Sequence, residues 1–117
     1  MREIKFRAWS KLDNKMFPSV GVDDGGVTII DTMAHGLYSV KGETVIMQYT
    51  GLLDKNGKEI YEGDILGQEQ FLPWGIMWDK AGFYAYNLHN PSTLYPFESA
   101  TNREVIGNIY ENKDLLK

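Results

Sequence analysis

Residues 47–65 read MQYTGLLDKNGKEIYEGDI, in which strand-forming residues flank a cluster of turn residues. Larger apolar side chains recur at every second position over residues 44–50, which predicts a strand. Asn56-Gly57 is the strongest short hairpin signal, and we expect a type I′ turn because both residues tolerate a positive φ. The return strand is expected at residues 58–61. The stretch therefore predicts an antiparallel hairpin.

Glycines mark the corners around this hairpin. We expect Gly51 and Gly63 at sharp corners, where a residue without a side chain is favoured. The next strand is expected at residues 64–66, and Gly67 is expected to bulge or kink it. Tyr49, Tyr61 and Ile65 are expected in the core.

The rest of the chain is also divided into segments of strand length, by twelve scattered glycines. Pro18 is expected to interrupt one run, Pro73 to separate two others, and residues 90–92 to form a loop. The remaining expected strands cover residues 3–9, 74–78, 83–88 and 104–109, with a hairpin within 19–42.

This pattern predicts an all-β protein, a small antiparallel barrel or sandwich whose core is filled by the fifteen aromatic residues. A chain of 117 residues is the size of one domain, so we expect a single β domain over residues 1–117. A short C-terminal helix is expected from about Asn112, which can cap it, with Leu115 and Leu116 docking.

The composition excludes several classes of function. No cysteine is present, so disulfides, thiolate metal sites and cysteine nucleophiles are excluded, and we expect a cytoplasmic protein. The longest uncharged run, residues 81–97, is interrupted by Pro91 and Pro96, whereas a membrane span needs about 20 mostly apolar residues. We therefore expect no association with a membrane.

Residues able to carry chemistry are few. His35 and His89 are far apart in sequence, and we expect structural roles for both. Glu62 and Asp64 could hold a hard cation if the chain were extended there, but we expect a turn in which Asp64 accepts backbone hydrogen bonds. We therefore expect no catalytic residue, no metal and no cofactor, and a protein that is not an enzyme.

The charge is uneven, because residues 1–58 hold eight Lys and Arg against seven Asp and Glu, and residues 59–117 hold four against nine. Lys5, Arg7 and Trp9 share one side of the expected first strand, so two cations and an indole could bind a partner or an unpaired nucleic-acid base. The alternatives are a cation–π contact on a solvated face, or burial of Trp9 beneath a neighbouring strand.

Three segments of the chain resemble the YopX family of phage and prophage proteins: residues 1–9 (MREIKFRAW), 47–65 and 105–112 (VIGNIYEN). They span the chain from end to end, whereas residues 18–42 and 68–103 are variable loops that carry no resemblance. Family members commonly have aspartate after the tryptophan and proline in the terminal helix, where this chain has Ser10 and Lys113.

The resemblance implies an SH3-like barrel with an N-terminal β extension, a phage or prophage origin, and self-association, for example as a trimer. It implies no particular activity, so no catalytic or binding residue carries over. We expect a non-enzymatic accessory protein that binds another protein, of host or phage, through one face of the barrel. The alternative is a nucleic-acid-binding barrel that uses the basic N-terminal strand.

Overall fold

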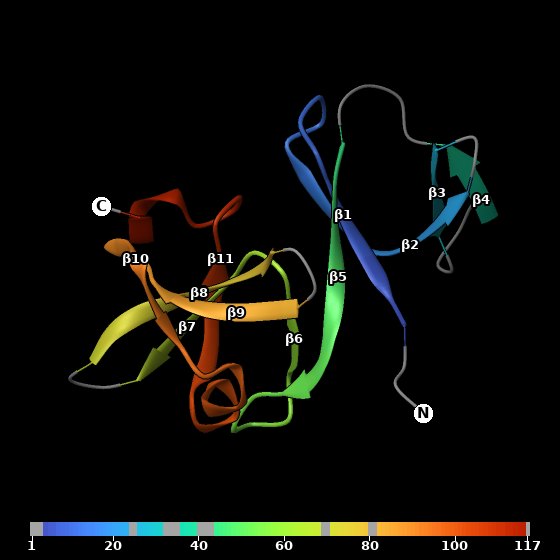
Figure 1. Cartoon of the computed structure of the whole chain (residues 1–117). Helices are drawn as coiled ribbons and strands as arrows, with labels where there is room; N and C mark the ends of the chain where they lie inside the picture. The colour runs from blue at the N-terminus through green and yellow to red at the C-terminus, as the bar shows by residue number, and fades with distance from the viewer. Residues whose placement is uncertain are drawn as a thin grey trace. The chain divides into compact units, whose positions relative to one another are not determined.

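The computed structural model describes residues 4–23, 26–31, 36–39, 44–68, 71–79 and 82–116. The chain divides into two compact units, Met1–Gln48 and Tyr49–Lys117, which we call the N-terminal and C-terminal units. Both are built from antiparallel strands (Figure 1). The all-β prediction is confirmed, and the C-terminal unit curls into part of a small barrel. The expectation of a single domain stays a prediction. No helix in the described residues is long and apolar enough to cross a bilayer.

Eleven strands lie in two sheets, ordered β4-β3-β2-β1-β5-β6 and β10-β9-β8-β7-β11 among the described residues. Strand β5 passes from the N-terminal to the C-terminal unit, since it pairs with β1 through residues 44–48 and with β6 through Tyr49 and Leu53. The strands are β1 (Phe6–Ser10), β2 (Lys15–Asp23), β3 (Gly26–Asp31), β4 (Gly36–Ser39), β5 (Thr44–Leu53), β6 (Glu59–Tyr61), β7 (Asp64–Gln68), β8 (Phe71–Asp79), β9 (Gly82–Asn87), β10 (Asn90–Tyr95) and β11 (Glu104–Asn108).

The N-terminal unit has a small apolar cluster beneath β1 and β2. Ala8, Phe17 and Val20 are buried in it, and Phe6 packs against them from the start of β1. The predicted strand at residues 3–9 is observed as β1, and the predicted hairpin within 19–42 is observed in the pairing of β2 with β3. Its turn was expected at residues 23–26; Asp23 and Gly26 pair with each other, and residues 24 and 25 lie outside the described residues.

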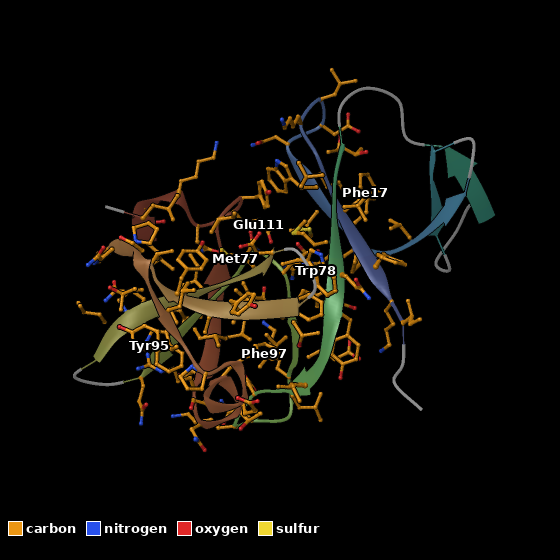
Figure 2. The ribbon with its side chains drawn as sticks, viewed as in Figure 1. Phe17, Met77, Trp78, Tyr95, Phe97 and Glu111 are labelled. Atoms are coloured by element: carbon orange, nitrogen blue, oxygen red, sulfur yellow. The ribbon has the colours of Figure 1, made fainter. Side chains whose placement is uncertain are left out.

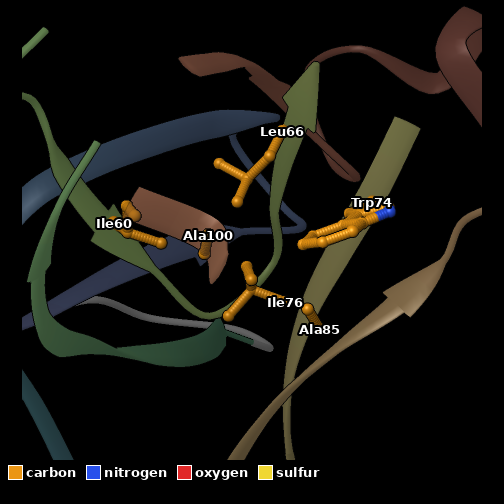
Figure 3. Packing of buried hydrophobic residues seen from close by; sticks show 6 residues of the cluster. All are labelled: Ile60, Leu66, Trp74, Ile76, Ala85 and Ala100. Atoms are coloured by element: carbon orange, nitrogen blue, oxygen red, sulfur yellow. The ribbon is translucent and has the colours of Figure 1, made fainter. Parts of the chain in front are cut away.

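The C-terminal unit has the larger core, shown in Figure 3. Ile76 and Ala85 face each other across β8 and β9, and Leu66 of β7 pairs with Trp74 of β8. Period-two alternation turns these side chains to the same side of the sheet. Ile60 of β6 and Ala100 complete the cluster.

Prolines were expected to end strands, and this expectation was wrong at three places. Pro18 lies inside β2, Pro73 inside β8 and Pro91 inside β10. Each proline lies at a place where the pairing of two strands shifts register. These shifts occur between β1 and β2 for Pro18, between β7 and β8 for Pro73, and between β9 and β10 for Pro91. A proline that lacks an N–H is tolerated where the ladder is already irregular.

The hairpin at residues 54–58 exists, but its turn is not type I′. Only Gly57 has a positive φ, of 84°, whereas Asn56 does not, and a type I′ turn requires both. The N–H of Gly57 donates to the carbonyl of Asp54 at 3.0 Å, and the N–H of Asp54 donates to the carbonyl of Lys58 at 2.7 Å. This is a type I turn closed by a glycine bulge.

Two 3₁₀ helices follow the strands of the C-terminal unit. The expected C-terminal helix is observed at η2 (Lys113–Leu116), where the N–H of Leu115 donates to the carbonyl of Asn112. Leu116 stays 43% exposed, so the expected docking of this residue is wrong. The other helix, η1 (Phe97–Asn102), falls in the variable region and was not predicted.

Candidate functional site

Asp54 is the centre of a hydrogen-bond network that joins the hairpin to β11. Its Oδ1 accepts the N–H groups of Asn56 and Lys58, each at 2.8 Å, and its Oδ2 accepts the N–H of Val105 at 2.8 Å. Burial alone raises the pKa of Asp54, but the three N–H donors and the charge of Lys58 outweigh it, so the pKa lies below the ordinary value of 3.8. The carboxylate therefore has a structural role.

The Glu62–Asp64 corner is also structural. Asp64 is buried, and its Oδ2 accepts the N–H of Tyr61 at 2.8 Å, as expected for a turn aspartate. Gly63 has a φ of 83°, its N–H donates to the carbonyl of Ile76, and its own carbonyl accepts the N–H of Ile109. The corner thus links β6, β8 and the end of β11.

Changing Gly63 to alanine is expected to lower the free energy of unfolding by about 1 kcal/mol, because an L side chain is strained at this φ. Gly82→Ala is the matched control, since a Cβ there meets no atom within 4 Å and its φ is not positive. Urea unfolding followed by circular dichroism measures both. Equal stability of the two variants would contradict the requirement for glycine at this corner.

The C-terminal motif is held by Asn108, which is buried at the end of β11. Its Oδ1 accepts the N–H groups of Tyr110 and Glu111, and its Nδ2 donates to Glu111 Oε1 at 2.8 Å. The N–H of Asn108 donates to Asn112 Oδ1 at 3.0 Å. Asn112 also lies over Gly107, where a Cβ would be 2.5 Å from the Asn112 oxygen. In the middle and C-terminal segments that carry the family resemblance, Asp54, Asp64 and Asn108 thus hold the fold.

Of the three residues singled out near the start of the chain, Arg7 and Trp9 lie on β1, and Lys5 directly precedes it. Trp9 is only 6% exposed, and Lys5 and Arg7 are half-buried. The indole is therefore buried, which was one of the structural alternatives for this residue. Ser10, at the position where the family commonly has aspartate, accepts the N–H of Asp13 on its Oγ at 3.1 Å. A binding role for this strand stays a prediction.

Of the two histidines, the structure describes His89. His89 is exposed in the turn between β9 and β10, and its N–H donates to Asn87 Oδ1 at 2.9 Å. His35 lies outside the described residues. Over the described ranges, no three His, Cys, Asp or Glu side chains lie close enough together to hold a metal ion.

A buried stack lies at the edge of the C-terminal core. The guanidinium of Arg103 lies 3.7 Å from the centroid of the Trp74 ring, and Tyr95 stacks on Trp74 at 4.3 Å. Arg103 Nη1 donates to the carbonyl of Leu72 at 3.0 Å, and burial lowers the pKa of Arg103. Figure 2 shows Tyr95 together with Phe97 on this unit. The stack fixes η1 and the end of β10 against β8.

Apolar side chains gather on the outer face of the five-stranded sheet, opposite the core. Met77 pairs with Tyr84 across β8 and β9, and Tyr86 pairs with Leu94 across β9 and β10. These four residues alternate with core residues, so they share the other side of the sheet. Tyr84 is 39% and Leu94 51% exposed, and Met77 and Tyr86 are half-buried. We call Met77, Tyr84, Tyr86 and Leu94 the outer patch.

The backbone of β8 shapes this patch through Gly75. A Cβ on Gly75 would lie 2.3 Å from Cζ of Tyr86, so the Tyr86 ring lies directly over the glycine. Burial raises the pKa of Tyr86, and the nearby Tyr110 raises it further. The tyrosine is therefore held neutral and flat against the sheet, as part of an apolar surface.

Sequence reasoning did not find the outer patch, because all four residues lie in the variable region 68–103. A signal existed in the alternation over residues 74–78 and 83–88, where two sets of apolar side chains point to opposite faces. Only the cross-strand register shows that Met77 meets Tyr84 and that Tyr86 meets Leu94. An aromatic and methionine-containing surface is typical of protein interfaces.

The model of the family described as YopX protein matches residues 5–117. Among curated proteins, none matches the chain. The crystal structure of protein EF1440 from Enterococcus faecalis is similar, with 28% sequence identity and a TM-score of 0.66 over 100% of both chains.

Proposed function

The chain belongs to the YopX family, and we propose that it is a non-enzymatic phage or prophage protein that binds another protein through the outer patch. In the middle and C-terminal segments that carry the family resemblance, the polar side chains hold the fold. The exposure of Tyr84 and Leu94 beside Met77 and Tyr86 supports this proposal. Asp54, Asp64 and Asn108 use their side-chain oxygens on backbone N–H groups.

The patch has the composition of an interface core. Tyrosine gives a large contact area with little rotamer entropy to lose, and methionine adapts to irregular surfaces. Tyr86 is already fixed over Gly75, which reduces the entropy lost on binding. Exposed apolar residues elsewhere, such as Leu12 at 71% exposure in the turn before β2, serve as isolated comparisons.

A photo-crosslinking residue placed at position 84 is expected to capture a specific protein partner in host cells, whereas the same residue at position 12 is not. Tyr84→Ser and Leu94→Ser are then expected to weaken binding of that partner by about tenfold or more each, because removal of an interface hot spot costs about 2 kcal/mol and a tenfold change corresponds to about 1.4 kcal/mol. Leu12→Ser is expected to leave binding unchanged. The Kd is measured by fluorescence anisotropy.

Equal crosslinking at positions 84 and 12 would contradict the proposal, and so would patch variants that bind the captured partner like the wild type. All variants must first show the same urea midpoint as the wild type, so that a loss of folding is not read as a loss of binding. Binding of a fluorescent oligonucleotide that weakens with salt and disappears in the Lys5→Ala/Arg7→Ala double variant would favour the nucleic-acid alternative instead.

A further inference from the structure

Acidic side chains outnumber basic ones among the described exposed residues of the C-terminal unit. Within residues 64–116 of the described chain, Arg103 is buried against Trp74, which leaves Lys113 as the basic side chain that reaches solvent. Five acidic side chains are exposed or half-exposed in the same segment: Asp79, Glu98, Glu104, Glu111 and Asp114. Lys55 and Lys58 of the same unit are also exposed, and Glu59 and Glu62 are half-exposed, so acidic side chains outnumber basic ones on the described surface of the unit.

Two of these acids, Asp79 and Glu111, lie on the outer side of the sheet. Asp79 follows Met77 by two positions on β8 and so points to the same face of the sheet. Glu111 lies in the turn after β11 and is exposed. The side chain of Asn112, in the same turn, lies over Gly107. Gly107 pairs with Ile65 of β7, and Ile65 pairs with Gly75 of β8, so these three residues face the same side of the sheet. The turn thus belongs to the outer side of the sheet.

The width of the patch limits the shape of the partner. Its residues come from three adjacent strands, β8, β9 and β10. Strands lie about 4.8 Å apart, so the patch is about 10 Å wide. An α-helix with its side chains is also about 10 Å in diameter. One amphipathic helix therefore covers the patch along its length.

We propose that the outer patch binds a basic amphipathic helix of a partner protein, with leucine, phenylalanine or methionine on one face and lysine or arginine beside it. The inference rests on the proposed function and adds the class of partner. The apolar face contacts Tyr84, Tyr86 and Leu94. The flanking cations face Asp79 and Glu111, which steer the approach and set the orientation of the helix.

Three dye-labelled synthetic peptides test the proposal with the full chain. The first has leucine and phenylalanine at helical spacing i, i+3, i+4, i+7 and lysine elsewhere; the second has glutamate in place of lysine; the third is a scrambled version of the first. The lysine helix is expected to bind at least about tenfold more tightly than either of the others, with an affinity that falls as salt rises.

Variants separate the two parts of the claim. Tyr84→Ser and Leu94→Ser are expected to weaken binding of the lysine helix, as is the pair Asp79→Asn/Glu111→Gln, while Leu12→Ser leaves it unchanged. If the lysine and glutamate helices bind equally and both need Tyr84, the basic-partner inference is overturned while the proposed protein interface stands. If Tyr84→Ser weakens neither peptide binding nor capture of a cellular partner, the proposed interface itself is overturned.

Discussion

Replacing Asp54 with alanine is expected to lower the free energy of unfolding by about 3 kcal/mol, because three backbone N–H groups lose a charged acceptor at once. The N–H of Val105 is the most affected, since Asp54 is its partner from 51 positions away in the sequence. Asp79→Ala is the control, because Asp79 is an exposed acid and its removal is expected to change stability by less than about 0.5 kcal/mol. Urea unfolding at neutral pH measures both.

The same carboxylate predicts a dependence on pH. The pKa of Asp54 is lowered in the folded protein, so its contribution is complete above the ordinary value of 3.8 and is lost as pH falls through the lower folded value. The stability difference between wild type and Asp54→Asn is therefore expected to shrink in acid. In Asp54→Asn one oxygen becomes an NH₂ donor, so one of the three N–H donors loses its acceptor. A difference that stays constant down to strong acid would contradict this role.

Replacing Trp74 with alanine is expected to lower the free energy of unfolding by about 4 kcal/mol, the range for removal of a large aromatic side chain from a core. The indole lies between Tyr95 and the guanidinium of Arg103. Its removal leaves a cavity beside Leu66 and also takes away the ring over which the buried cation lies. The measurement is again urea unfolding, followed by circular dichroism.

Trp78→Ala is the matched control for this prediction. Trp78 is 43% exposed and makes an edge contact with Phe83 at 4.7 Å, so its loss is expected to cost about 1 kcal/mol. Trp74→Phe, which keeps a ring in the stack, is expected to fall between the two alanine variants. A Trp74→Ala variant as stable as Trp78→Ala would show that the stack contributes little.

The parts of the fold that depend on local pattern could be predicted from the sequence. Alternation over residues 44–50 predicted β5, and turn residues on either side of 83–88 predicted β9. Gly63 lies at the expected corner with a φ of 83°, whereas Gly51, with a φ of 90°, lies within β5 at a register shift. The turn type was wrong because Asp54 determines it through hydrogen bonds to the backbone of residues 56 and 58. The proline positions were wrong because ladder irregularities depend on the partner strand.

The candidate site depends on register, which no single segment contains. Met77 and Leu94 come together only through Tyr84 and Tyr86 of the strand between them. The cluster that the sequence favoured, on β1, was local to one strand and includes the buried Trp9. Alternation in the sequence groups residues of a single strand by face, whereas grouping residues of three strands requires knowledge of how the strands pair.

The edge strands of the five-stranded sheet are β10 and β11. On β11, the N–H of Val105 is taken by Asp54 and the N–H of Asn108 by Asn112, and on β10 Pro91 has no N–H to give. A strand of another molecule that added to either edge would find no free backbone N–H group at these positions. At these three positions the edge strands disfavour addition of a further strand, which leaves the face of the sheet as the surface for a partner.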